Sequence, residues 1–129
     1  MKCWYFRDYI DSAGLNVIEQ WLHSLPQSAR LEINTRIQYL EVLRRLVRPD
    51  TAMLKGECHG LMELRITHNK IRYRPLACYG PGDRQITLLM GAIEKGGRFE
   101  PLSACKTALK RKAEIQEPGR TNEHSLAEP

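Results

Sequence analysis

The stretch that decides the fold is ELRITHNKIRYR, residues 63–74. Apolar residues occupy every second position on both sides of the polar THNK, an alternation typical of strands with one buried face. A two-residue turn at His68-Asn69 would join the two strands, because Asn tolerates the positive φ that such turns need. The stretch therefore predicts a β-hairpin with one apolar face and one charged face.

The charged face of this hairpin carries Glu63, Arg65, Arg72 and Arg74. In the register that the turn sets, Arg65 lies opposite Arg72, and Glu63 lies opposite Arg74. Directly opposed like charges repel, which favours a surface that binds an anion. A solvated strand face with one Glu63–Arg74 ion pair explains the hairpin alone equally well. The rest of the chain has to distinguish these interpretations.

Length and composition predict one folded domain. The 129 residues are 42% hydrophobic and 27% charged, which is normal for a globular protein and argues against wholesale disorder. The net charge is +5, and the isoelectric point is about 9.2. This balance favours an anionic partner, such as nucleic acid or an acidic protein.

The cysteines and the apolar segments indicate the cellular compartment of the protein. The four cysteines are widely spaced, so they fit neither a zinc knuckle nor a thioredoxin-type pair. The histidines form no cluster with metal-ligand spacing. The first ten residues lack the apolar core of a signal peptide, and no run approaches the roughly 20 apolar residues of a membrane span. We expect a cytoplasmic protein with reduced thiols, no metal, no cofactor and no membrane contact.

Periodicity and chain breakers predict an α+β fold in the order β-α-α-β-β-β-α. The fold would be a small, mostly antiparallel sheet with an N-terminal helical hairpin and a C-terminal helix. We expect the helical hairpin to cover one face of the sheet and to leave the charged face open. A domain over residues 1–116 would precede a disordered tail over 117–129, which lacks periodicity.

Further cations flank the charged face. Lys55 and His59 lie in the loop before the hairpin, and Lys95 and Arg98 lie in a glycine-rich loop after an apolar strand. Each also has an ordinary interpretation as a solvated loop residue.

Together with the sheet arginines, these groups suit phosphate binding and the charge that develops during phosphodiester cleavage. If the RNA's own 2′-hydroxyl is the nucleophile, such a site needs a base and no metal. Glu63 is the candidate base, or it orients an arginine.

Three motifs in this order carry a resemblance to a known family: LKGECHGLMELRI, IRYRPL and ITLLMGAIEKGG. Over residues 3–115 the chain resembles the RelE/ParE toxin superfamily, and specifically its phage-derived HigB-like branch. The resemblance implies a small antiparallel sheet with a helical hairpin. It also implies the toxin of a type II toxin–antitoxin system, acting as an mRNA interferase on messages in the ribosome.

The resemblance also implies roles for individual residues. The catalytic positions would be Lys55, Glu63, Arg65, Arg74 and Lys95, and the RNA-binding positions would be His59, Arg72 and Arg98. The partners would be a cognate antitoxin, in a possible hetero-oligomer, and mRNA on the ribosome.

The chain departs from the family pattern at two positions. Ala92 stands where the branch often has an aromatic residue, and Glu94 stands where it often has a lysine. No catalytic tyrosine or histidine is obvious before the tail. Two alternatives therefore stay open: a ParE-like inhibitor of DNA gyrase, and a catalytically inactive protein that binds its antitoxin.

Overall fold

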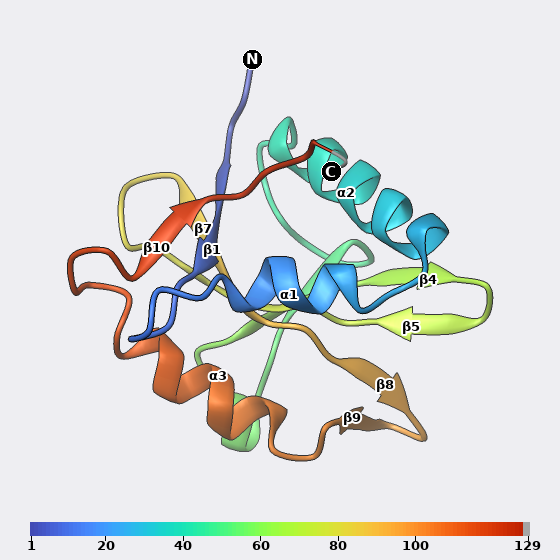
Figure 1. Ribbon diagram of the computed structural model, residues 1–129. Helices are drawn as coiled ribbons and strands as arrows, with labels where there is room; N and C mark the ends of the chain where they lie inside the picture. The colour runs from blue at the N-terminus through green and yellow to red at the C-terminus, as the bar shows by residue number, and fades with distance from the viewer. Residues whose placement is uncertain (128–129) are drawn as a thin grey trace.

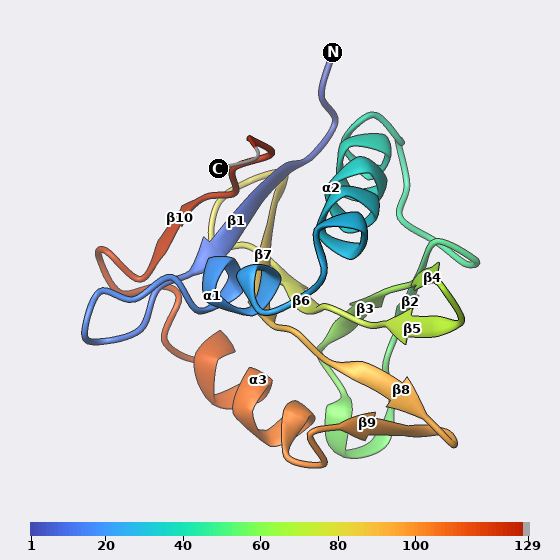
Figure 2. The same cartoon turned by 45° about the vertical axis from the view of Figure 1, so that its right-hand side comes forward.

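The protein is α+β, as the sequence predicts, in a computed structural model that describes residues 1–127. The helices are α1 (Val17–His23), α2 (Gln27–Glu41), the short 3-10 helix η1 (Gly56–Cys58) and α3 (Ala104–Lys112). The larger sheet has the order β10-β1-β7-β6-β3-β2, with strands Thr121–Glu123, Tyr5–Tyr9, Gln85–Met90, Leu76–Tyr79, Met62–Leu64 and Thr51–Met53. The smaller sheet has the order β4-β5-β8-β9, with strands Ile66–His68, Ile71–Tyr73, Ile93–Lys95 and Arg98–Glu100 (Figures 1 and 2). Strand pairs are antiparallel except β1 with β7.

The hairpin forms, but its turn is one residue later than predicted. Asn69 and Lys70 occupy the turn with φ values of 49° and 65°, in place of His68-Asn69. Positive φ at both central residues matches the right-handed twist of the flanking strands. The turn conformation therefore sets the register.

The later turn changes the cross-strand partners. Ile66 lies opposite Tyr73, and Thr67 lies opposite Arg72. The predicted opposition of Arg65 and Arg72 is therefore wrong. The alternation of apolar and polar faces survives, because the register moves by two residues and side chains alternate with a period of two.

The two strands of the hairpin also pass from one sheet into the other. The first strand breaks at Arg65, whose N–H donates to the carbonyl of Asp50 at 2.9 Å. The second breaks at Arg74 and Pro75, and the N–H of Arg74 donates to the carbonyl of Ala92 at 2.8 Å. Proline has no N–H to donate to a ladder, which suits it to such a break. Arg65 and Arg74 therefore lie where the two sheets meet.

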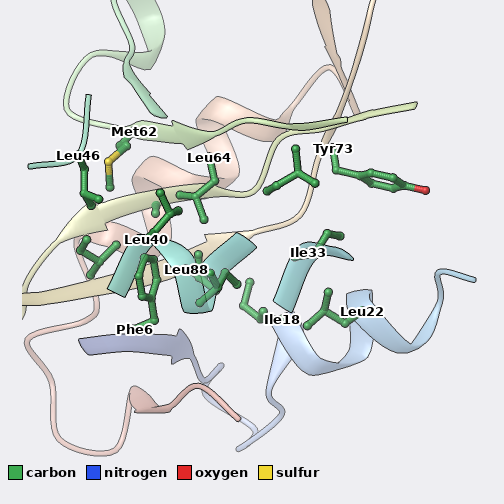
Figure 3. Close-up of a cluster of buried hydrophobic side chains, with 14 of the residues drawn as sticks. Phe6, Ile18, Leu22, Ile33, Leu40, Leu46, Met62, Leu64, Tyr73 and Leu88 are labelled. Carbon is green, nitrogen blue, oxygen red and sulfur yellow. The ribbon is translucent and has the colours of Figure 1, made fainter. Parts of the chain in front are cut away.

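Helices cover both faces of the larger sheet, which corrects the expectation that one face stays open. On one face α1 and α2 bury an apolar cluster against the strands, and Figure 3 shows Ile33 and Leu40 of α2 among Phe6, Leu64 and Leu88. On the other face α3 packs small residues against the strands in a second cluster, with buried members Tyr9, Leu61, Leu76, Cys78, Leu89, Ala92, Ala104, Cys105, Ala108 and Ile115. The charged residues lie at the β3 end of this second face.

The helical hairpin is shorter than predicted. The α1 helix begins after Asn16, whose side chain accepts two backbone N–H groups of the first turn. The α2 helix ends at Glu41, whereas the helical spacing of the apolar residues predicts an end near Arg48-Pro49. No helix within residues 1–127 combines the length and the apolar character that crossing a membrane requires.

The C-terminal segment is ordered where the sequence predicts disorder. Residues Thr121–Glu123 form β10, which pairs with the edge of β1. His124 is buried, with its Nδ1 2.7 Å from a carboxylate oxygen of Asp8 and its Nε2 2.9 Å from the Oδ1 of Asn34. Residues 128–129 of the predicted tail lie outside the described residues.

The expectation of uniformly reduced thiols is wrong as well. A disulfide joins Cys58, in the loop before β3, to Cys105 in α3, with Cα atoms 5.2 Å apart. Cys3 and Cys78 are free. Spacing along the chain could not reveal this pair, because the two cysteines are 47 residues apart.

Candidate functional site

A buried glutamate occupies the β3 end of the second sheet face. Glu63 lies in β3 opposite Leu76 of β6 and is 8% exposed. Burial raises the pKa of its carboxyl above the ordinary value, although the nearby charges of Arg74, Arg65 and Arg48 oppose that shift. The effect of burial therefore exceeds that of the surrounding arginine charges.

Two arginines flank Glu63 in different ways. Arg65 is partly exposed, and its Nε lies 3.4 Å from a carboxylate oxygen of Glu63. Arg74 is 4% exposed and donates from a terminal guanidinium nitrogen to the carbonyl of Tyr73 at 3.0 Å. The predicted Glu63–Arg74 ion pair is therefore replaced by a Glu63–Arg65 pair, while Arg74 acts on Glu63 through its nearby charge.

The partner of Arg74 is Glu94, a residue that the sequence analysis placed outside the site. The Nε of Arg74 lies 3.3 Å from one carboxylate oxygen of Glu94, and a guanidinium nitrogen of Arg72 lies 3.4 Å from the other. The β5–β8 ladder sets this geometry, because it pairs Arg72 directly with Glu94. We call the five residues Glu63, Arg65, Arg72, Arg74 and Glu94 the arginine–glutamate cluster.

The remaining predicted cations lie in two other segments, the η1 loop and the β8–β9 hairpin. Lys55 and His59 are exposed at either end of η1. Lys95 and Arg98 form a directly opposed pair at the tip of the β8–β9 hairpin, where Lys95 pairs with Glu100 at 3.4 Å. The glycine-rich segment that the sequence predicts as a loop is thus a tight hairpin, in which Gly96-Gly97 connect the strands.

The structure gathers some predicted residues and separates others. Glu63, Arg65, Arg72 and Arg74 belong to one charged cluster, as the hairpin pattern predicts. Alternation along β8 places the side chain of Lys95 on the opposite face of the small sheet from Glu94. The eight predicted residues therefore do not share one continuous surface.

The arrangement suits proton transfer beside an anion. Burial raises the pKa of the Glu63 carboxyl, which makes this group a stronger base than an exposed carboxylate. The adjacent Arg65 is exposed enough to reach a ligand, and its planar guanidinium can bind a phosphate with two hydrogen bonds. Arg74 is too buried for the same contact, so it contributes charge and positions the strand ends.

The sequence does not indicate three elements of the site. Glu94 was noticed only as a departure from a family pattern, and the correct strand register would have paired it with Arg72. Arg48 acts on Glu63 from the segment after α2, and no periodicity indicates that approach. The link from the η1 loop to α3 through Cys58 depends on three-dimensional proximity.

A comparison with known protein families identifies the family of this chain. The family model described as phage-derived protein Gp49-like matches residues 20–113, which include the C-terminal part of α1, all of α2 and the whole cluster. A search of curated proteins gives no match. The chain therefore belongs to the phage-derived Gp49-like family, a toxin-like family related to RelE and ParE whose members are often the toxin of a toxin–antitoxin system.

Proposed function

We propose that this protein is the toxin of a type II toxin–antitoxin system and a metal-independent mRNA interferase of the HigB-like branch. The observation that carries the proposal is Glu63, a buried carboxyl with a raised pKa that lies beside the partly exposed Arg65. Such a pair supplies both requirements of RNA cleavage through the 2′-hydroxyl: a group that exchanges a proton and a cation for the phosphate.

Each member of the site has a role in this proposal. Arg65 binds the scissile phosphate, and Glu63 takes the proton of the attacking 2′-hydroxyl. Arg74 is a positioning residue that adds positive charge behind the site. We assign Lys55, which is exposed at the N-cap of η1, as the cation for the leaving oxygen.

Other predicted cations serve binding rather than chemistry. Arg72 and Arg98 are exposed, as is His59, and all three can contact the RNA backbone outside the cleavage position. Lys95 has an exposed ion pair with Glu100, and it too fits a backbone contact better than catalysis. Phosphate contacts of this kind add affinity without base preference.

Expression in a bacterial host tests the proposal. Wild-type protein should arrest growth and leave messages cut at discrete positions, whereas Arg65→Ala should do neither while keeping its unfolding midpoint. The matched control is Lys106→Ala, which removes an exposed cation on α3 outside the cluster and should remain toxic. Full toxicity in a folded Arg65→Ala protein would refute the assigned role.

The second candidate function is a ParE-like inhibitor of DNA gyrase or a binding protein without catalysis. The observation that favours it is Glu94, which neutralises Arg72 and Arg74 in this chain. It predicts growth arrest with intact messages, or no arrest. A supercoiling assay with purified gyrase distinguishes the two functions, because an interferase leaves gyrase active.

A cognate antitoxin is the protein partner in either case. The chain carries a net charge of +5, so the segment that covers the toxin should be acidic. We propose that toxin and antitoxin form a hetero-oligomer. Size-exclusion chromatography of the co-expressed pair tests this, since the toxin should elute with the antitoxin and not alone.

A further inference from the structure

The Cys58–Cys105 disulfide lies at the surface beside a proposed functional loop. Cys58 is partly exposed, whereas Cys105 is almost completely buried. Both line a hollow between η1, the β8–β9 turn and the start of α3, together with Glu57, Gly97, Arg98, Phe99 and Leu102. A small thiol can therefore approach the sulfur of Cys58 from solvent.

Few links hold the loop that carries Cys58. Within residues 1–127, the links described between residues 55–60 and α3 are the disulfide and one hydrogen bond, in which Lys112 Nζ donates to the carbonyl of Gly60 at 3.0 Å. The η1 helix has no side-chain hydrogen bond at its N-cap. Lys55 at that N-cap is exposed. Opening the disulfide would thus remove the covalent link between this loop and α3, and would leave the Lys112 hydrogen bond and the packing of Cys58 against the second apolar cluster.

We propose that Cys58 and Cys105 form a redox-active disulfide, open to a low-molecular-weight thiol or a dithiol reductant, whose state controls the order of the η1 loop. The incoming thiolate attacks the sulfur of Cys58, the bond to Cys105 breaks, and the Cys105 thiolate takes up a proton. A second thiolate then attacks the reductant's sulfur in the mixed disulfide and releases Cys58, which is protonated in turn. The net change is two electrons and two protons to the protein and one disulfide in the reductant.

Cys78 provides an internal contrast. It is free and buried in the second apolar cluster, and burial raises the pKa of its thiol to about 11. A thiol with such a pKa carries little thiolate at neutral pH, so it reacts slowly with oxidants and alkylating reagents. The two cysteines of the pair are therefore separable from Cys78 by their reactivity in the folded protein.

The consequence for activity rests on the proposed function. The oxidised state holds the loop that carries Lys55 and His59 against α3, and the reduced state lets that loop fluctuate. We expect the reduced toxin to cut RNA at least fivefold more slowly than the oxidised toxin. Oxidising conditions would then raise the activity of the toxin.

Alkylation and hydrogen exchange of the full chain test the proposal. The protein is oxidised with oxidised glutathione or reduced with dithiothreitol, and then alkylated at neutral pH without denaturant. Reduction should add two alkyl groups, at Cys58 and Cys105, and leave Cys78 unmodified. Amide exchange over residues 54–61 should rise at least tenfold on reduction, with no change in β7.

Matched variants make the result specific. Cys105→Ser should show fast exchange over residues 54–61 under both conditions, whereas Cys78→Ser should keep the redox difference. Failure of Cys58 and Cys105 to pair under oxidised glutathione would overturn the proposal, as would equal exchange in the two states. These readouts need no RNA, so they hold or fail independently of the proposed cleavage. If both states cut RNA at the same rate, the redox control of activity is wrong.

Discussion

Glu94→Gln tests whether one carboxylate holds the arginine–glutamate cluster together. The substitution keeps the size of the side chain and removes the charge that faces both Arg72 and Arg74. Arg74 is 4% exposed, so its guanidinium cannot recover the lost interaction from water. A hydrogen bond to a charged group contributes about 1.5–3 kcal/mol, and a neutral one about half as much.

These values predict that Glu94→Gln lowers the free energy of unfolding by about 2 kcal/mol. Most of the loss should come from Arg74, because Arg72 is 58% exposed and exposed ion pairs contribute roughly 0.2–1 kcal/mol. Arg72→Gln should therefore cost about 0.5 kcal/mol. Loss of the Glu94 charge should also lower the pKa of Glu63, since that charge raises it.

Urea unfolding at pH 7 measures these differences, provided that the slope of the free energy against urea stays unchanged. The control is Glu100→Gln on the neighbouring strand, where both partners of the Lys95–Glu100 pair are exposed, and we expect a loss below about 0.5 kcal/mol. Equal losses for Glu94→Gln and Glu100→Gln would refute the reasoning. So would an Arg72→Gln loss as large as that of Glu94→Gln.

Three further predictions follow from buried groups outside or within the cluster. Burial raises the folded-state pKa of Glu63 above its unfolded value of 4.5, so its stabilising contribution is present below pH 4.5 and is lost as pH rises through the folded pKa. The stability of Glu63→Gln should therefore increase relative to that of wild type as pH rises. The same difference in urea midpoint between the variant and wild type at pH 4 and at pH 8 would contradict this. His124→Ala should cost about 2–3 kcal/mol, because it leaves the buried carboxylate of Asp8 without its closest partner; a thermal shift below roughly 2 °C would argue against it. Gly91→Ala should destabilise by more than about 2 kcal/mol, since the new Cβ would overlap the Trp21 indole; wild-type stability in denaturant would show that the helix can move away.

The sequence could specify the face of the hairpin but not its register. A shift of the register by two residues leaves Ile66 on the same apolar face. Alternation therefore cannot distinguish a register that pairs Ile66 with Ile71 from one that pairs it with Tyr73. The choice depends on which two residues adopt positive φ, and Asn69 is central to both candidate turns. The charged residues of the hairpin were therefore predicted correctly to lie together, while their cross-strand partners were not, and their role in a functional site stays a prediction.

The C-terminal segment and the second sheet face depend on contacts between distant residues. His124 lies 116 positions from Asp8 along the chain, and no local pattern indicates that the two meet. The small residues of α3, such as Ala104 and Ala108, let that helix approach the sheet closely, but their spacing alone does not say which face they cover. Long-range packing of this kind decides how much of the charged face stays open.

Primer extension on a reporter mRNA in a translating extract tests the central claim most directly. Wild type should produce discrete cuts that depend on the ribosome, and Lys106→Ala should reproduce them. Arg65→Ala should remove the cuts while its unfolding midpoint stays equal to that of wild type. Intact message with the wild-type protein, or the same cuts with a folded Arg65→Ala protein, would contradict the assignment of the arginine–glutamate cluster as an interferase site.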